Sequence, residues 1–380
     1  MSTWITLSPS LPGCFDGIGD NAWNLARALS AHGRVHQVAR PLGAVAAGKT
    51  RAVHSGAASV QDVEVLDSWR ELATASWRAR ARAVDGVVVH YFPPAFLHHD
   101  LPALVRWLET VTRAGRPVVL AVHEIGPAKD GRLRRTVIRA LYRQVLLALL
   151  ARTSQVIVTT DWARRELASA RLTIGRDVRI VPIGSNISRV PATAPPVDHT
   201  LVMFGQPGHM YREAIVALGR WLATHGAMVR LTWLGRSTDE LRAAWCGQYG
   251  LPAHRVTFDG GLPEAEVSAR LSAASIGLAP YDQGLSTRRS SLAALVEHAL
   301  PIVGLDGPGT DDLLRQSGAF MLSPLTDADA FVRNVAAVLT DEPRRRALAQ
   351  AAERLFTTTL SWPRIADAYL AALTMRPEGV

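Results

Sequence analysis

The sequence predicts an α/β protein with two Rossmann-like domains, each a doubly wound parallel sheet. Short apolar runs alternate with helical patterns in both halves of the chain, as expected for consecutive β-α-β units. Several runs are apolar at every position, which is typical of parallel strands buried on both faces. A proline-rich stretch separates the halves, and 380 residues are enough for two domains of ordinary size.

The composition argues against several classes of protein. With 48% hydrophobic and 20% charged residues, the chain is an ordinary globular protein. It shows no apolar run of membrane-spanning length and no secretory leader, so we expect a cytoplasmic location. Cys14 and Cys246 fall in different halves, which indicates neither a metal site nor a disulfide framework. The net charge of +9 suits anionic small molecules or an anionic membrane surface, and no nucleic-acid-binding motif accompanies it.

The chain begins with a predicted strand, residues 4–7, a loop ending in DGIGD, and a helix capped by Asp20. A strand, a glycine-rich turn and a helix start together present backbone N–H groups to an anion. Gly17 and Gly19 are therefore candidate phosphate contacts. They do not form GxGxxG, so a simple tight turn is the alternative.

Two further strands, GVVVH and PVVLAVH, end in His90 and His123. Ligands of open α/β sheets bind at the carboxyl ends of the strands, so both histidines are expected near a functional edge. For His90 we favour a structural role, with the ring satisfied by backbone. For His123 we favour function, because Glu124 beside it can orient or charge the ring.

A long helix over residues 132–152 carries Arg132, Arg135, Arg139 and Arg143 on one side. This stripe could make a peripheral contact with anionic lipid head groups. A solvated helix face is the commoner origin of such a pattern, and both interpretations stay open.

The domain boundary is predicted from PIGSNISRVPATAPPVD, because prolines cannot sit inside helices or central strands. We place the first domain at residues 1–187, a linker at 188–198 and the second domain at 199–360. Residues 361–380 are expected to form a C-terminal helix that packs back toward the first domain. Strands of the second domain are expected at 201–204, 229–234, 256–258, 276–279 and 302–305.

The stretch AASIGLAPYDQGLSTRRSSLAALVEHALPIVGLDG predicts a strand, a loop, a helix with Ser286 as its N-cap, and a second strand. Arg288, Arg289, Ser290 and Ser291 would occupy the first turns of that helix. A helix start offers unpaired N–H groups and the positive end of a dipole, to which guanidiniums and hydroxyls add. The loop therefore predicts a phosphate or diphosphate site, with solvated surface arginines as the alternative.

Six segments in a fixed order extend over nearly the whole length of the chain: GIGDNAWNLARALSAHG, RPVVLAVHE, SQVIVTTDWARREL, VRIVPIGSNI, VTFDGGLPEAEVSARLSAASIGLAPY and STRRSSLAALVEHALPIV. In these segments, their order and their spacing, the chain resembles GT-B glycosyltransferases of the family 4 type. The resemblance implies two domains facing across a cleft, and sugar transfer from a nucleotide-diphosphate sugar with retention of configuration. It further implies no metal and no cofactor beyond that co-substrate. A UDP- or GDP-linked donor and a small-molecule, saccharide or lipid-linked acceptor are expected.

The resemblance also implies roles for individual residues. Gly17 and Gly19 match the loop that approaches the donor phosphate, and His123 matches a histidine beside the transferred sugar. Arg212 lies near the family's basic residue for the diphosphate.

Other positions would border the nucleoside and the acceptor. Gly260, Gly261 and Leu262 match the family's loop beside the nucleoside. The acceptor is expected against loops of the first domain that include Asp16, Tyr91 and His98.

The sequence departs from the family's usual E-x7-E motif, whose glutamates would fall at Ser286 and Ala294. It is similar to a branch with SxRRxSLxAAL at this place. A carboxylate nucleophile could come only from residues such as Glu124 or Asp282, so we favour a front-face reaction in which the leaving phosphate takes the acceptor's proton. Altered chemistry on the same scaffold, such as an epimerase or a coupling enzyme, and a non-catalytic nucleotide-sugar binder stay as alternatives.

Overall fold

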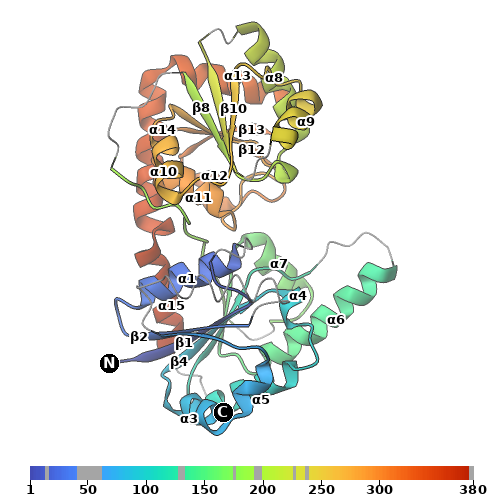
Figure 1. Ribbon diagram of the computed structural model, residues 1–380, viewed down its shortest axis with the longest axis vertical. Coiled ribbons are helices and arrows are strands. Elements are labelled where there is room, and N and C mark those ends of the chain that lie inside the picture. Colours follow the sequence, from blue (N-terminus) through green and yellow to red (C-terminus); the bar gives the residue numbers. More distant parts are fainter. Residues whose placement is uncertain are drawn as a thin grey trace. The chain divides into compact units, whose positions relative to one another are not determined.

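The computed structural model describes residues 1–12, 17–40, 62–126, 133–173, 177–191, 199–225, 228–235 and 239–375. The chain divides into two compact units, Met1–Pro182 with Trp362–Val380, and Ile183–Ser361. Each unit is built on one parallel sheet with helices on its faces (Figure 1). The predicted fold class, two doubly wound parallel-sheet domains, is confirmed.

The described sheet of the first unit has the order β3-β2-β1-β4-β5-β6-β7, and all neighbouring strands are parallel. The strands are β1 (Thr3–Ser8), β2 (Arg34–Ala39), β3 (Asp62–Val65), β4 (Gly86–Tyr91), β5 (Val118–Val122), β6 (Gln155–Val158) and β7 (Val178–Ile180). The direction of winding reverses between β1 and β4. In α/β sheets, ligands bind beside the carboxyl ends of strands at such a reversal.

Alternate residues of the central strands pack on opposite faces of this sheet. Val87 and Val89 join one core cluster with Leu104, whereas Val88 joins another with Ile365. Because both faces are covered, the central strands are apolar at nearly every position. The helices are α1 (Ile18–Leu29), η1 (Trp69–Ala73), α3 (Ala75–Ala83), α4 (Pro93–Phe96), α5 (Leu101–Arg113), α6 (Leu133–Leu150), α7 (Asp161–Ser169) and α15 (Trp362–Thr374), of which α15 packs against α1.

The described sheet of the second unit has the order β10-β9-β8-β11-β12-β13 and is also parallel throughout. Its strands are β8 (Thr200–Phe204), β9 (Arg230–Leu234), β10 (Val256–Asp259), β11 (Ile276–Ala279), β12 (Ile302–Asp306) and β13 (Phe320–Pro324). Its helices are η2 (Pro207–His209), α8 (Arg212–His225), α9 (Asp239–Tyr249), α10 (Glu264–Ser272), α11 (Ser290–Glu297), α12 (Asp312–Gln316), α13 (Ala328–Thr340), α14 (Glu342–Leu355) and η3 (Phe356–Leu360). Here the winding reverses between β8 and β11.

The start of the expected linker is held by the second unit. The backbone N–H groups of Ser188 and Val190 donate to Glu264 Oε1 (2.9 Å) and Ser268 Oγ (2.8 Å) on α10. These bonds hold residues 188–190 within the second unit, which begins at Ile183. The rest of the expected linker, from residue 192, lies outside the described residues.

Among the described helices, none combines the length and the apolar character needed to cross a membrane. Helix α6 contains the expected arginine stripe only in part. Arg132 lies outside the described residues, and Arg139 forms an ion pair with Glu166 of α7. Arg143 is exposed on the same helix.

Candidate functional site

The loop between β11 and α11 is tied to the neighbouring loop that follows β12. The backbone N–H and the hydroxyl of Thr287 both donate to Asp311 Oδ2, at 2.8 Å and 2.7 Å, and both residues are buried. The N–H of Leu285 donates to Thr310 Oγ1 at 3.2 Å. These bonds fix the backbone that carries Arg288 and Arg289.

Close packing at Gly284 adds to this rigidity. Its φ is +86°, in the region that favours glycine, and a Cβ there would lie 2.2 Å from Thr310 Oγ1. The loop can therefore approach its neighbour this closely only with glycine at position 284.

The loop after β11 is also joined to the loop after β8. Met210 and Tyr281 form an isolated antiparallel bridge, and the N–H of Tyr211 donates to the Pro280 carbonyl at 2.7 Å. Since β8 and β11 flank the reversal of winding, this pair of loops lies where an open α/β sheet binds its ligand.

Arg289 presents a largely buried guanidinium within this loop. Its side chain is 13% exposed, and its Cζ lies 4.3 Å from the centroid of the Tyr281 ring. Asp282 Oδ1 is 3.5 Å from Arg289 Nη2, and Arg289 Nε is buried with no hydrogen-bond partner. Burial lowers the pKa of Arg289 from its usual value. The group is a cation whose hydrogen-bonding capacity the fold leaves partly unused, as expected of an anion site.

The expected N-cap at Ser286 is wrong. Helix α11 begins at Ser290, and Arg289 is the N-cap residue with an extended backbone. The bonds between Thr287 and Asp311 hold the preceding residues in a turn, so the helix starts later than the sequence pattern predicts. Ser286 is buried instead, and its Oγ accepts from the Arg288 N–H at 3.4 Å.

The first turn of α11 still faces this loop. Ser291 Oγ lies 3.1 Å from the hydroxyl of Tyr281, which links the helix start to the ring below Arg289. Ser290 is the first helical residue. Arg288 is exposed and forms no ion pair with any of the described residues. Two guanidiniums and a helix N-terminus thus occur within four consecutive residues, and both kinds of group attract phosphate.

The other expected donor-side residues lie at the same edge of the second sheet. Arg212 begins α8, is exposed, and reaches the Gln248 carbonyl at 3.5 Å. Gly260, Gly261 and Leu262 directly follow β10, with Leu262 half-buried against the core. The residues identified from the sequence therefore lie in segments that follow β8, β10 and β11, at the carboxyl edge of the second sheet.

In the first unit, Gly17 and Gly19 lie at the start of α1, after β1. Asp20 lies in the first turn rather than at the cap, because Gly17, with φ +57°, is the N-cap residue. A Cβ at Gly19 would lie 2.7 Å from Ser10 Oγ, so packing requires this glycine. Asp16 lies outside the described residues.

His123 follows β5 and pairs with a second histidine. Its Nε2 lies 3.0 Å from Nδ1 of His90, which is fully buried on β4. Burial lowers the pKa of His123 to about 4 and holds the pKa of His90 well below its usual value. The ring is therefore neutral near pH 7, which corrects the expectation that Glu124 charges it. Glu124 itself is exposed.

Of the expected acceptor-side residues, Tyr91 has no exposed surface. Its hydroxyl donates to the Tyr142 carbonyl at 3.2 Å, and its ring packs 5.4 Å from that of Phe96. Burial raises its pKa. Tyr91 therefore belongs to the core, because side chains alternate along β4 and position 91 points into the cluster that contains Val89.

His98 remains partly exposed and belongs to a cluster that the sequence did not reveal. Its Nδ1 lies 3.0 Å from Arg40 Nη2 and 2.8 Å from Asp100 Oδ1. Burial alone would raise the pKa of Asp100, but hydrogen bonds from Ser68, Trp69 and His98 outweigh it and lower that pKa. Arg40 directly follows β2, a position that could have indicated it.

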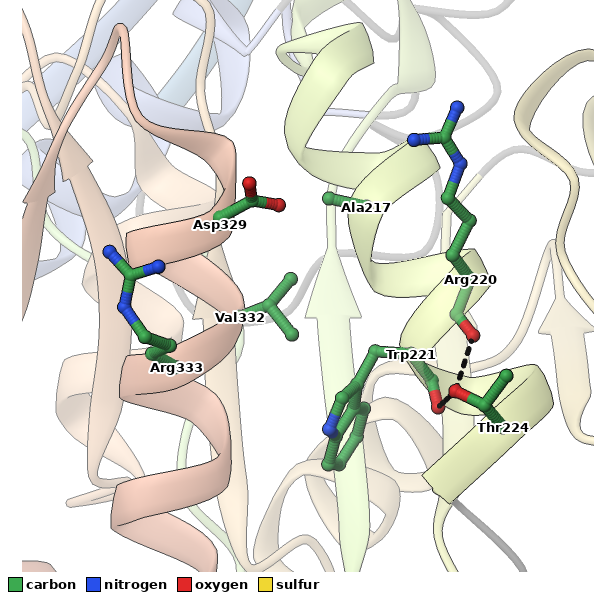
Figure 2. Close-up of a pocket in the computed structure, with 7 residues that line it drawn as sticks. All are labelled: Ala217, Arg220, Trp221, Thr224, Asp329, Val332 and Arg333. Atoms are coloured by element: carbon green, nitrogen blue, oxygen red, sulfur yellow. Dashed lines mark hydrogen bonds between the residues drawn. The ribbon is translucent and has the colours of Figure 1, made fainter.

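A separate hollow of about 340 Å³ lies between α8 and α13 (Figure 2). Trp221 and Val332 line it, and the Thr224 hydroxyl contacts carbonyls of its own helix (Figure 2). An adjoining hollow includes Arg212. None of the other expected site residues that the structure describes lines either hollow, so the arginine loop rather than this groove is the candidate site.

No protein-family model and no curated protein sequence matches this chain. Solved structures do match it. Sucrose-phosphate synthase from Thermosynechococcus elongatus is 16% identical, with a TM-score of 0.63 over 98% of each chain. The Anabaena protein HepE in complex with UDP and glucose is 14% identical, with a TM-score of 0.68 over 98% of this chain and 100% of that one.

A further match is a Listeria monocytogenes protein described as a UDP-N-acetylglucosamine 2-epimerase. It is 13% identical, with a TM-score of 0.58 over 100% of this chain and 99% of that one. At these identities the likeness shows fold, and it extends over nearly the full length of each chain. The chain therefore has the two-domain fold of the GT-B glycosyltransferases.

Proposed function

We propose that this protein is a retaining, metal-independent glycosyltransferase of the family 4 type. It would transfer a sugar from a UDP- or GDP-linked donor to a small-molecule, saccharide or lipid-linked acceptor, with no other cofactor. The observation that carries the proposal is Arg289, a largely buried guanidinium with an unpartnered Nε beside the N-terminus of α11. The full-length likeness in fold to a structure described with bound UDP and glucose supports the same conclusion.

The chemistry of the reaction explains why such a loop is needed. The bond between the sugar's anomeric carbon and the donor phosphate breaks, a bond to the acceptor oxygen forms, and the acceptor's proton passes to the leaving phosphate oxygen. Negative charge therefore grows on the diphosphate in the transition state. Arg288, Arg289 and Arg212 together with the first N–H groups of α11 would stabilise that charge.

Other residues take supporting roles in this proposal. Ser290 and Ser291 would donate hydroxyl hydrogen bonds to the phosphates, and Gly260, Gly261 and Leu262 would border the nucleoside. In the first unit, Gly17 and Gly19 would approach the phosphate, and His123 would contact the transferred sugar. Ser286 acts through the backbone of the loop, because it is buried and bonded to Arg288 N.

One alternative has a specific observation in its favour. Ser286 and Ala294 replace the family's glutamates, and a protein described as an epimerase is among those of similar fold. An epimerase acting on a nucleotide sugar would also have to bind the diphosphate, because the bound diphosphate positions the sugar ring at which the reaction takes place. Arg289 would serve either reaction.

The proposal can be tested without a known acceptor, because water can act as a slow acceptor in its place. The protein is mixed with UDP-glucose, GDP-mannose or UDP-N-acetylglucosamine, and hydrolysis of the donor is followed by proton NMR. We expect slow release of the nucleoside diphosphate. The free sugar that forms first should have the same anomeric configuration as the sugar in the donor. The rate should be unchanged by a chelator.

Other outcomes separate the alternatives. A first-formed sugar of opposite configuration would contradict retention, and loss of activity with the chelator would contradict metal independence. Conversion to a second nucleotide sugar without release of free sugar would favour the epimerase. A variant carrying Arg289→Ala should lose the activity in each case, whereas Arg346→Ala, an exposed arginine of α14, should not.

A further inference from the structure

Two imidazole rings meet edge to edge at the carboxyl ends of β4 and β5. His90 Nδ1 lies 3.0 Å from His123 Nε2, with the ring centroids 5.3 Å apart and the planes inclined by 18°. The centroid separation exceeds the nitrogen separation by about the sum of two ring radii, so the nitrogens lie on the line between the centroids. This is the geometry of a directed, in-plane hydrogen bond rather than of face-to-face stacking.

The surroundings of the two rings differ. His90 is fully buried, and its Nε2 has no hydrogen-bond partner. His123 is partly exposed, and within the described part of the chain its Nδ1 has no hydrogen-bond partner. Because burial lowers the pKa of both rings, each is neutral near pH 7 and carries one ring proton.

Only two proton arrangements fit this pair. In the first, His90 donates from Nδ1 to His123 Nε2, which leaves the buried His90 Nε2 as a bare acceptor. In the second, His123 donates from Nε2, and the single proton of His90 must then sit on its Nε2 as a buried N–H without an acceptor. An unpaired buried N–H is the rarer defect in folded proteins, so the first arrangement is favoured.

We infer that His90 is a positioning residue that holds His123 as the tautomer protonated on Nδ1. His123 then presents a neutral hydrogen-bond donor at the carboxyl edge of the first sheet. Such a ring suits a ligand oxygen with free lone pairs, a sugar hydroxyl or a phosphate oxygen, and it does not suit removal of a proton. The role in sugar binding rests on the proposed function, whereas the tautomer is a property of the protein alone.

The tautomer can be measured directly on the full chain labelled with ¹⁵N at histidine. Long-range ¹H–¹⁵N spectra at pH 7 distinguish protonated from bare ring nitrogens, and His123→Gln identifies the signals of His123. We expect His123 to show a protonated Nδ1 and a bare Nε2, in about tenfold excess or more over the other form. A protonated Nε2 in the wild-type protein would overturn the inference.

Two variants test whether His90 sets this preference. His90→Leu removes the donor, so His123 should shift toward the Nε2-protonated form. His90→Asn places an amide nitrogen where the ring Nδ1 stood, so it should keep His123 protonated on Nδ1. An unchanged tautomer in a folded His90→Leu protein would overturn the positioning role, and if that variant does not fold, the Asn variant and the wild-type spectrum decide.

The measurement of the His123 tautomer is independent of the proposed function. If no nucleotide sugar binds but the spectra show the expected tautomer, the sugar-transfer proposal fails and the histidine pair stands. If a nucleotide sugar binds and the tautomer is reversed, the inference about His90 fails alone.

Discussion

The guanidinium of Arg289 lies over the face of the Tyr281 ring, with Cζ 4.3 Å from the ring centroid. The ring is itself fixed, because Tyr281 is buried and its hydroxyl contacts Ser291 Oγ at 3.1 Å. Stacking on an aromatic face orders the arginine before a ligand arrives, so less side-chain entropy is lost on binding. Arg289 is therefore a preorganised cation rather than a flexible surface charge.

Asp311 should support the arginine loop without touching a ligand. Asp311→Ala removes the carboxylate oxygen that accepts from the N–H and the hydroxyl of Thr287, so we expect a loss of about 1 to 3 kcal/mol in the free energy of unfolding. Affinity for a nucleoside diphosphate should also fall. Urea unfolding and calorimetry measure the two effects.

The neighbouring Asp312→Ala variant is the matched control, since Asp312 is exposed and, among the described residues, pairs with Arg315 alone. Its effect on the free energy of unfolding should stay within about 0.5 kcal/mol. Equal effects of the two substitutions would contradict the role assigned to Asp311.

Gly284→Ala should destabilise the protein more than a glycine-to-alanine change that causes backbone strain but no steric clash. The new Cβ would sit 2.2 Å from Thr310 Oγ1 in addition to its unfavourable φ of +86°. Backbone strain and overpacking together should cost about 2 to 5 kcal/mol. Gly250→Ala has a similar φ, +63°, and open space, so it should cost only about 1 to 2 kcal/mol. Thermal melts that rank the two variants equally would show that the loop tolerates the added methyl group.

His123 should make the stability of the protein depend on pH. Burial lowers its pKa from 6.5 to about 4, so the unfolded chain binds a proton more readily than the folded one between these values. Its contribution is fully present above pH 6.5 and is lost as the pH falls toward 4. Between pH 7 and pH 5 the loss should be on the order of 2 kcal/mol.

Urea unfolding of the wild type and of His123→Gln at both pH values isolates this contribution. Glutamine can still hydrogen-bond to His90 but does not titrate in this range. The difference in stability between the two proteins should shrink or reverse at pH 5. An equal pH dependence would mean that the fold does not hold His123 as a neutral ring.

The exposed face of α6 should bind anionic lipid if the arginine stripe contacts membranes. Val137 and Leu141 are 51% and 45% exposed, Arg143 is exposed on the same helix, and the helix contains no acidic residue. The double change Val137→Ser with Leu141→Ser should reduce co-sedimentation with vesicles containing phosphatidylserine several-fold. Met228→Ser, a highly exposed methionine in the second unit, serves as control. No binding of the wild type to these vesicles would reject the membrane contact.

The strongest sequence signals came from strands buried on both faces and from the arginine loop. Strands β4, β5, β8 and β11 could be predicted without tertiary information. A strand that is buried on both faces is apolar at nearly every position, and this pattern is visible in the sequence alone. Strand β2 was not predicted, since its sequence RVHQVA places a polar residue, Gln37, in the interior. Gln37 is tolerated there because Thr6 of the neighbouring strand hydrogen-bonds to it. That partner is visible only once the strands are paired.

Predictions about the site were wrong or missing where the structure depends on contacts between residues that are distant in sequence. Ser286 has the residue type of an N-cap, but Thr287 is hydrogen-bonded to Asp311, 24 residues after it, and the helix therefore begins later. The pairing of His90 with His123 likewise depends on the register of β4 and β5, in which His90 lies opposite Ala121. The glycines and arginines could be identified from local pattern, whereas the partners that hold them could not.

Binding of nucleoside diphosphates tests the central claim most directly. Calorimetric titrations with UDP, GDP, ADP and TDP should use the wild type, Arg289→Ala, Arg289→Lys and the exposed control Arg346→Ala. We predict that at least one of them binds the wild type, that Arg289→Ala weakens this binding about tenfold or more, and that lysine restores it only in part because it lacks the planar fork. Absence of binding by all four nucleotides, or the same affinity in the wild type and Arg289→Ala, would contradict the account.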